Sequence, residues 1–141
     1  MMITSLALAT AAAFTGAAAY INWSEQPARL ALDDDALLKE WKLSYARGLQ
    51  MQASLAVISG LLGLAAGYFE HQWLAAAGGL LMLANWPYTF LAMIPTNKRL
   101  EAMADGREGP RPLIHKWGRL HAVRTLLGFA ASGAFLIAAT G

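Results

Sequence analysis

Four long stretches of this chain are apolar and nearly free of charge, and they strongly restrict how the chain can fold. They cover residues 3–22, 48–67, 73–94 and 120–140. Each stretch has about the 20 apolar residues that an α-helix needs to cross a bilayer. Since lipid offers no hydrogen bonds to the backbone, such stretches fold as spanning helices. We therefore predict an all-α integral membrane protein, a four-helix bundle that forms a single domain over residues 1–141.

The composition supports a membrane protein without a separate soluble domain. Of the 141 residues, 57% are hydrophobic and only 14% are charged. The formal net charge of +2 does not indicate a nucleic-acid partner, because the basic residues lie between apolar spans and form no continuous basic run. Membrane lipid is the anionic neighbour that we expect. The chain has no cysteine, which excludes disulfides, thiolate nucleophiles and cysteine-ligated metals.

The distribution of Lys and Arg predicts the orientation in the membrane. All 11 of these residues fall within 29–47 and 98–124, whereas the termini and the 68–73 turn have none. By the positive-inside rule, segments 23–47 and 95–119 are cytoplasmic and both termini face outward. We expect the inner membrane of a bacterium. A cleavable signal peptide is the alternative for the first span, but the start of the chain lacks a positive region, which favours a retained span.

Several local signals predict where the helices begin and end. Asp33 to Asp35 are suited to cap and charge the start of the second helix. Pro87 predicts a kink within the third span. Pro95 predicts the end of that span, with Asn97 as the cap of a short interfacial helix.

The fourth helix carries the strongest candidate site. Trp117, His121 and Arg124 are four and three residues apart, so they share one face, which we expect to look into the bundle. An arginine exposed to lipid costs about 3 kcal/mol on insertion scales, so Arg124 should pair with an acid or line a wet cavity. Glu25 is the partner that we predict. The alternatives are a purely structural Glu25–Arg124 pair and an Arg124 side chain that reaches the headgroups.

Two further polar and aromatic faces are expected near Arg124. They are formed by Trp41, Tyr45, Gly48 and Gln52 on the second helix and by Asn85, Tyr88 and Thr89 on the third. Most Trp and Tyr residues lie in the charged half, which fits an aromatic-lined pocket and fits equally an interfacial belt on one side. A pocket of this kind suits a planar phenolic or quinone-like molecule, with Arg124 stabilising an enolate or phenolate and His121 accepting a proton. A structural role for His121 remains the alternative.

Metal binding is poorly supported. His115 and His121 are six residues apart and do not share a helical face, and His71 belongs to the opposite side of the membrane. We predict no metal site. A site formed by Glu25 and His121 is the alternative, but two side chains supply too few ligands for a metal ion.

Three segments resemble a known family. They are Tyr20 to Arg29, Pro95-Thr96-Asn97 with Leu100, and Trp117 to Arg124. Together they resemble the family of small four-span membrane proteins that includes fungal anthrone oxygenases, many bacterial members of which have no assigned activity. The resemblance covers essentially the whole chain. It implies a four-helix membrane bundle and, for the characterised members, oxidation of an anthrone to an anthraquinone by molecular oxygen.

The resemblance and the helical faces together give one set of candidate residues. The resemblance places Glu25, Pro27, Arg29, Trp41, Asn97, Trp117, His121 and Arg124 around a shared site. The predicted catalytic residues are His121 as base, Arg124 and Asn97 as oxyanion donors, and Glu25 as the group that orients them. The predicted substrate-binding residues are Trp23, Arg29, Trp41, Tyr45, Asn85, Tyr88 and Trp117.

The leading hypothesis is an oxygenase-like enzyme that acts on a hydrophobic aromatic or quinone-type molecule taken from the membrane. An anthrone carbanion is able to react with oxygen directly, so this hypothesis requires no cofactor. The first alternative is a non-catalytic binding or assembly protein whose polar cluster is structural or holds a lipid or partner. The second is a transporter or channel subunit formed by oligomerisation, because Ala and Gly surfaces allow close helix association. Gly63 and Gly67, which are four residues apart, predict close packing of the second helix against a neighbour.

Overall fold

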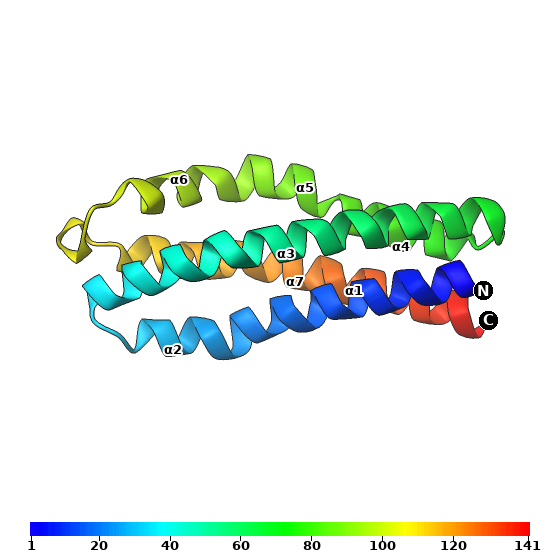
Figure 1. The fold of residues 1–141 in the computed structure, drawn as a ribbon, viewed down its shortest axis with the longest axis horizontal. Coiled ribbons are helices and arrows are strands. Elements are labelled where there is room, and N and C mark those ends of the chain that lie inside the picture. Colours follow the sequence, from blue (N-terminus) through cyan, green and yellow to red (C-terminus); the bar gives the residue numbers. More distant parts are fainter.

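The computed structural model describes residues 1–141 and contains four long helical segments (Figure 1). The first consists of α1 (Met2–Tyr20), the π-helical turn η1 (Ile21–Glu25) and α2 (Gln26–Leu30). The second is α3 (Asp34–Phe69). The third consists of α4 (Trp73–Leu83), α5 (Asn85–Tyr88), the π-helical turn η2 (Thr89–Met93) and α6 (Ile94–Ala102). After the 3-10 turn η3 (Gly106–Glu108), the fourth segment is α7 (Arg111–Thr140).

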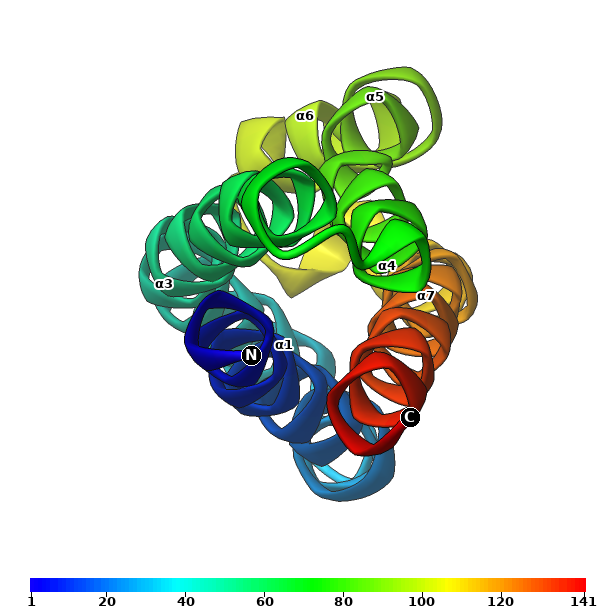
Figure 2. The ribbon, with the colours of Figure 1, turned by 90° about the vertical axis from the view of Figure 1, so that its right-hand side faces the viewer.

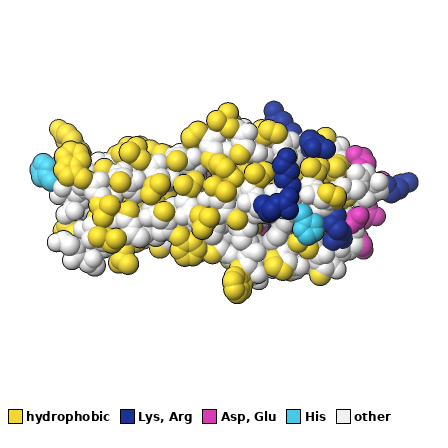
Figure 3. Space-filling model, turned by 180° about the vertical axis from the view of Figure 1, so that it is seen from behind, with side chains coloured by type: hydrophobic (Ala, Val, Ile, Leu, Met, Phe, Trp, Pro, Cys, Tyr) yellow, Lys and Arg dark blue, Asp and Glu magenta, His cyan; other side chains and the backbone are white.

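All four segments are long and apolar enough to cross a membrane. The chain contains no strand, which confirms the predicted all-α four-helix membrane bundle. Both termini lie at the same end of the bundle (Figure 1). Lys, Arg and most acidic side chains gather at the opposite end, and the surface between is largely apolar (Figure 3). Which side of the membrane each end faces stays a prediction.

Seen along the bundle, the helices form a four-sided arrangement in which α1 and α4 each lie between α3 and α7 (Figure 2). Small residues allow α3 and α4 to touch closely. A Cβ atom added at Gly63 would lie 2.7 Å from the Cα of Gly79, closer than atoms pack without a shift. The close approach predicted from Gly63 and Gly67 is confirmed, because Gly67 likewise faces Ala76.

The two π-helical turns each precede a proline by two residues. Pro27 follows η1 and Pro95 follows η2. A proline cannot donate to the helix ladder and crowds the carbonyl four residues earlier, and a wider turn accommodates both effects. A helix end at Pro95 is therefore wrong: α6 continues to Ala102 as part of the same long segment. Where the membrane span itself ends stays a prediction.

Other predicted boundaries agree with the structure. The helix α3 begins at Asp34, and the Asp33 carboxylate accepts a hydrogen bond of 2.9 Å from the Ala36 amide, as expected for a cap. The helix interruption at Ala84 lies three residues before Pro87. Asn97, in contrast, lies inside α6 and caps no helix; the residue before α6 is Met93, which makes no side-chain cap.

The buried interior consists of two apolar clusters. One, in the half that contains the termini, is built mainly from alanines with Phe14, Met82 and Phe135. The other, in the charged half, contains larger side chains such as Trp41, Leu100 and Trp117. Between these clusters lie polar side chains that are all buried except Asn22, which is half-buried, and we call them the polar layer. Its members are Asn22, Gln52, Asn85, Asn97, His121, Arg124 and Thr125.

Candidate functional site

Four members of the polar layer, Gln52, Asn97, His121 and Arg124, line a small cavity of about 20 Å³. Every helical segment contributes to its lining, through Ile21, Gln52, Asn97 and His121 among others. Arg124 lines this cavity together with His121. The sequence prediction that these two side chains share an inward face of α7 is confirmed, since they are only 6% and 1% exposed.

His121 is held in one orientation by Asn22, a residue of η1. The Nδ1 atom of His121 lies 2.7 Å from the Asn22 Oδ1 atom, and Thr125 donates to the same oxygen at 2.8 Å. The Asn22 amide nitrogen donates to the Gly118 carbonyl at 3.0 Å, which fixes which end of the amide is oxygen. Nδ1 must therefore carry the hydrogen, and the Nε2 lone pair remains available as a proton acceptor.

Asn22 was not among the predicted site residues. The signal that could have found it is its place within an otherwise apolar span, where an unpaired side-chain amide is costly and normally has a partner. Gln52, in contrast, was expected on the polar face of the second helix, and the structure places it inside the bundle. It is 1% exposed, lines the small cavity, and neither its oxygen nor its nitrogen has a hydrogen-bond partner in the protein.

A ladder of rings packs beside the cavity. Tyr45 stacks on Trp41 with centroids 4.8 Å apart, and Trp41 meets Trp117 edge to face at 6.0 Å. Trp117 in turn stacks on His121 at 5.0 Å. Tyr45 and Trp117 line the small cavity, and Trp41 packs between them without lining it. The ladder fixes the plane of the imidazole, and its predicted role in binding a substrate stays a prediction.

Other aromatic residues lie elsewhere. Trp23 is 89% exposed on the outside of the bundle, so its predicted place in the substrate pocket is wrong. Tyr20 is also exposed, as expected for an interfacial belt. Tyr88 is half-buried, and its hydroxyl donates to the Leu120 carbonyl at 2.7 Å, so it ties the third segment to α7.

Glu25 does not pair with Arg124, contrary to the prediction. Its carboxylate lies 2.6 Å from the Arg29 guanidinium and also accepts from the Ser44 hydroxyl. Arg29 forms a second ion pair of 2.6 Å with Glu40, and it lies over the Trp117 ring with its Cζ atom 5.3 Å from the centroid. One helical turn separates Glu25 from Arg29, so local geometry favours this pair over a partner on another helix. Arg29 thus packs over Trp117, one of the rings of the aromatic ladder.

Arg124 has no acidic partner. No ion pair involves its guanidinium, and its Nε atom is buried without a hydrogen-bond partner. Its Cζ atom lies 5.6 Å from the centroid of Phe14. A buried cation without an anion is costly, so this position favours an electron-rich oxygen from a bound molecule.

Asn97 also faces the polar layer. Its amide nitrogen donates to the Tyr45 hydroxyl at 3.1 Å, while its Oδ1 atom has no partner in the protein. The amide group is therefore engaged with Tyr45, and the atom left free is an acceptor. This arrangement is less suited to the predicted oxyanion-donor role than to accepting a hydrogen bond.

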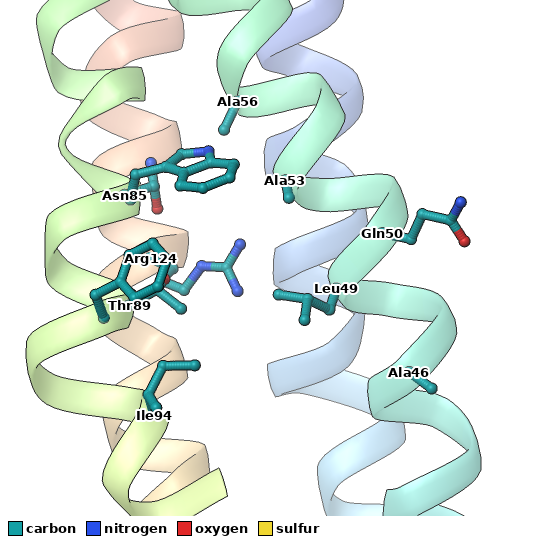
Figure 4. A pocket seen from close by; sticks show the side chains of 11 residues that line it. Ala46, Leu49, Gln50, Ala53, Ala56, Asn85, Thr89, Ile94 and Arg124 are labelled. Carbon is teal, nitrogen blue, oxygen red and sulfur yellow. The ribbon is translucent and has the colours of Figure 1, made fainter. Parts of the chain in front are cut away.

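A larger cavity of about 270 Å³ lies beside the polar layer, between α3 and the third helical segment (Figure 4). We call it the lateral cavity. Its walls are mostly apolar and include Leu49, Ala53 and Phe90. Arg124 lines both the lateral cavity and the small one, and in Figure 4 its guanidinium points into the space between the helices.

No group of three or more His, Asp or Glu side chains lies close enough together to hold a metal ion. Glu25 and His121, the alternative metal pair, have separate partners in Arg29 and Asn22.

The fold and the site define a four-helix integral membrane protein with a buried polar layer that is reached by an apolar cavity. The family model described as anthrone oxygenase matches residues 41–134, well over half of the chain. An anthrone oxygenase of Claviceps purpurea (strain 20.1) is 36% identical over 110 residues, which cover 68% of this chain and 63% of that protein. The chain therefore belongs to the anthrone oxygenase family.

The chain spans less than two thirds of the length of this curated fungal relative. No solved structure matches the chain significantly. Within the family match lie Trp41, Asn97, Trp117, His121 and Arg124, whereas Asn22, Glu25 and Arg29 precede it.

Proposed function

We propose that this protein is a membrane-embedded oxygenase that oxidises a hydrophobic aromatic or quinone-type molecule at the polar layer. The observation that carries the proposal is that Arg124 lines both the lateral cavity of about 270 Å³ and the small cavity that His121 also lines. His121 has a free proton-accepting nitrogen, and Arg124 is a buried cation without an acid. The similarity to a fungal anthrone oxygenase supports an anthrone as the test substrate.

The proposed reaction begins with proton removal. The Nε2 atom of His121 takes a proton from the activated CH2 group of an anthrone, and Arg124 stabilises the enolate oxygen that results. The carbanion carbon forms a bond to molecular oxygen, and after protonation this gives a hydroperoxide. Loss of water then breaks the O–O bond and forms the second carbonyl. Oxygen is the oxidant: one of its atoms enters the ketone and the other leaves as water, so this route requires no cofactor.

The direct test is oxygen consumption by the purified protein supplied with an anthrone. Replacing the base, His121→Ala, should lower kcat by about 100-fold or more, the usual contribution of a positioned base. His115→Ala is the matched control, because His115 is an exposed histidine on the same helix. Equal rates for His121→Ala and wild type would contradict the proposed base.

A second candidate function is a non-catalytic binding or assembly protein. The observation that favours it is the Asn22 network, which ties the first helical segment to α7 through His121, Thr125 and Gly118. In that case His121→Ala would lower the thermal unfolding temperature, while the rate of anthrone oxidation would equal the uncatalysed rate in wild type and variant alike.

The proposal includes a location. We place the charged end in the cytoplasm, in the inner membrane of a bacterium, because that end holds all Lys and Arg residues. Membrane lipid and the hydrophobic substrate are the partners that we propose. Self-association through alanine and glycine surfaces is a further expectation.

A further inference from the structure

The lateral cavity combines an apolar wall with two polar atoms that lack partners. Its volume of about 270 Å³ is close to the lower end of the range for small-molecule pockets. Trp86 and Phe90 line it and are 42% and 59% exposed, so they stand at its rim on the membrane-facing surface. A molecule dissolved in the bilayer can therefore reach the cavity without crossing water.

The polar atoms belong to Arg124 and Asn85. Asn85 is 1% exposed, and its amide nitrogen donates to the Met82 carbonyl at 3.1 Å, which fixes the orientation of the amide. Its Oδ1 atom has no partner in the protein. Figure 4 shows Asn85 and Arg124 on the same side of the cavity, on the third segment and α7. Two residues that line the cavity, one cationic and one neutral, thus each hold a buried polar atom without a partner.

We propose that the lateral cavity binds the ring system of a planar hydroxylated aromatic molecule that enters sideways from lipid. Arg124 binds a carbonyl or enolate oxygen of this ligand, and the Asn85 Oδ1 atom accepts a hydrogen bond from a ring hydroxyl. This inference rests on the proposed function for what happens to the ligand after binding. It adds the route of entry from lipid, the cavity that holds the rings, and Asn85 as the residue that favours hydroxylated ligands.

A lipid acyl chain is a poorer occupant of this cavity. It would cover the apolar wall but leave both the guanidinium and the amide oxygen buried without a hydrogen bond. A flat aromatic ligand with an oxygen acceptor and a hydroxyl donor satisfies both groups and buries its rings against Leu49 and Ala53.

Binding can be measured without turnover by using 2,6-dihydroxyanthraquinone, which is already oxidised and whose hydroxyls lie too far from the ring carbonyls to bond them, and its hydroxyl-free parent 9,10-anthraquinone. In lipid nanodiscs, quenching of tryptophan fluorescence reports occupancy, because Trp86 lines the cavity. Ala53→Phe fills the cavity from α3 and should weaken binding of both probes at least tenfold. Ser54→Phe is the matched control, since Ser54 is the adjacent exposed residue outside the lining.

The role of Asn85 has its own signature. Asn85→Leu should weaken 2,6-dihydroxyanthraquinone on the order of tenfold and leave 9,10-anthraquinone unchanged, because only the hydroxylated probe uses the acceptor. An equal loss for both probes in Asn85→Leu would overturn the selective role.

The outcomes separate this inference from the proposed function. Unchanged binding of both probes in Ala53→Phe, or normal anthrone oxidation by that variant, would overturn the lateral cavity as the site. If mass spectra show that bound phospholipid stays on the protein in the presence of either probe, the site would also be overturned, and the occupant would be an acyl chain. A third outcome is that the wild-type protein binds the probes but does not oxidise anthrone, and that Ala53→Phe loses the binding. This would support the cavity as a binding site and refute the oxygenase.

Discussion

The two halves of the bundle are built from different kinds of side chain. In the half that contains the termini, glycines and alanines bring helices into direct backbone contact, as at Gly63 and Gly79. In the charged half, rings and prolines dominate, and both cavities of the candidate site lie at its inner border. Small residues hold membrane helices together by close packing, whereas larger groups and π-helical turns space them apart. The contrast indicates that one half provides rigidity and the other provides room for a ligand.

The largest expected loss of stability comes from a substitution in the charged half. Arg29→Met removes the cation between Glu25 and Glu40 and leaves two carboxylates close together behind the aromatic ladder. Since Arg29 is 1% exposed but both acids are partly solvated, we expect a loss of about 2–4 kcal/mol in the free energy of unfolding. Denaturant titration in detergent micelles measures it. Arg107→Met is the control: its pair with Asp105 is exposed, so its loss should cost less than about 0.5 kcal/mol.

The next effect compares one substitution in the two halves. Gly63→Ala places a methyl group 2.7 Å from the Gly79 Cα atom and should cost about 1–3 kcal/mol through overpacking. Gly48→Ala meets nothing within 4 Å and should be neutral or slightly stabilising, because alanine favours a helix over glycine. The two unfolding midpoints, measured side by side, check this. Equal destabilisation would contradict the proposed difference in packing.

A smaller effect concerns the border between the halves. Asn22→Ala leaves the His121 Nδ1–H group, the Thr125 hydroxyl and the Gly118 carbonyl without their partner. We expect a loss of about 1–2 kcal/mol in unfolding free energy. If Asn22 also positions the base, kcat for anthrone should fall while KM changes little. Thr140→Ala, which removes an exposed hydroxyl bonded within its own helix, serves as the reference and should change neither quantity.

The smallest effect is a pH dependence at the terminal end. The Met1 amino group, the Thr4 hydroxyl and the Ile3 and Thr4 amides lower the pKa of Glu70 from 4.5 to about 2. Because the pKa is lowered on folding, this contribution is present above about pH 4.5 and is lost as the pH falls towards about 2. The protection factor for hydrogen exchange at the first turn of α1, which is the intrinsic exchange rate divided by the observed rate at each pH, should fall over that range. Glu70→Gln should remove the pH dependence; an unchanged profile in this variant would refute the assignment.

Much of the fold could be predicted from the sequence, for reasons local to each segment. An uncharged run of sufficient length must be a helix in lipid, and Asp33 caps α3 through atoms three residues away. The inward face of α7 also followed from spacing, because Trp117, His121 and Arg124 lie on one side of any helix. Pro95 was misjudged because its local rule applies to a regular α-helix, and the chain forms a π-helical turn before it.

The sequence by itself determined the four spans, the charge asymmetry and the inward face of α7, since these depend on composition and helical period alone. Only the tertiary structure decided which side chains meet: Arg29 with Glu25, Asn22 with His121, and Arg124 with no acid at all. It also decided that α3 and the third segment leave a cavity beside Arg124. The physical reason is that partner choice depends on the rotation and separation of whole helices, which packing at distant glycines and prolines sets.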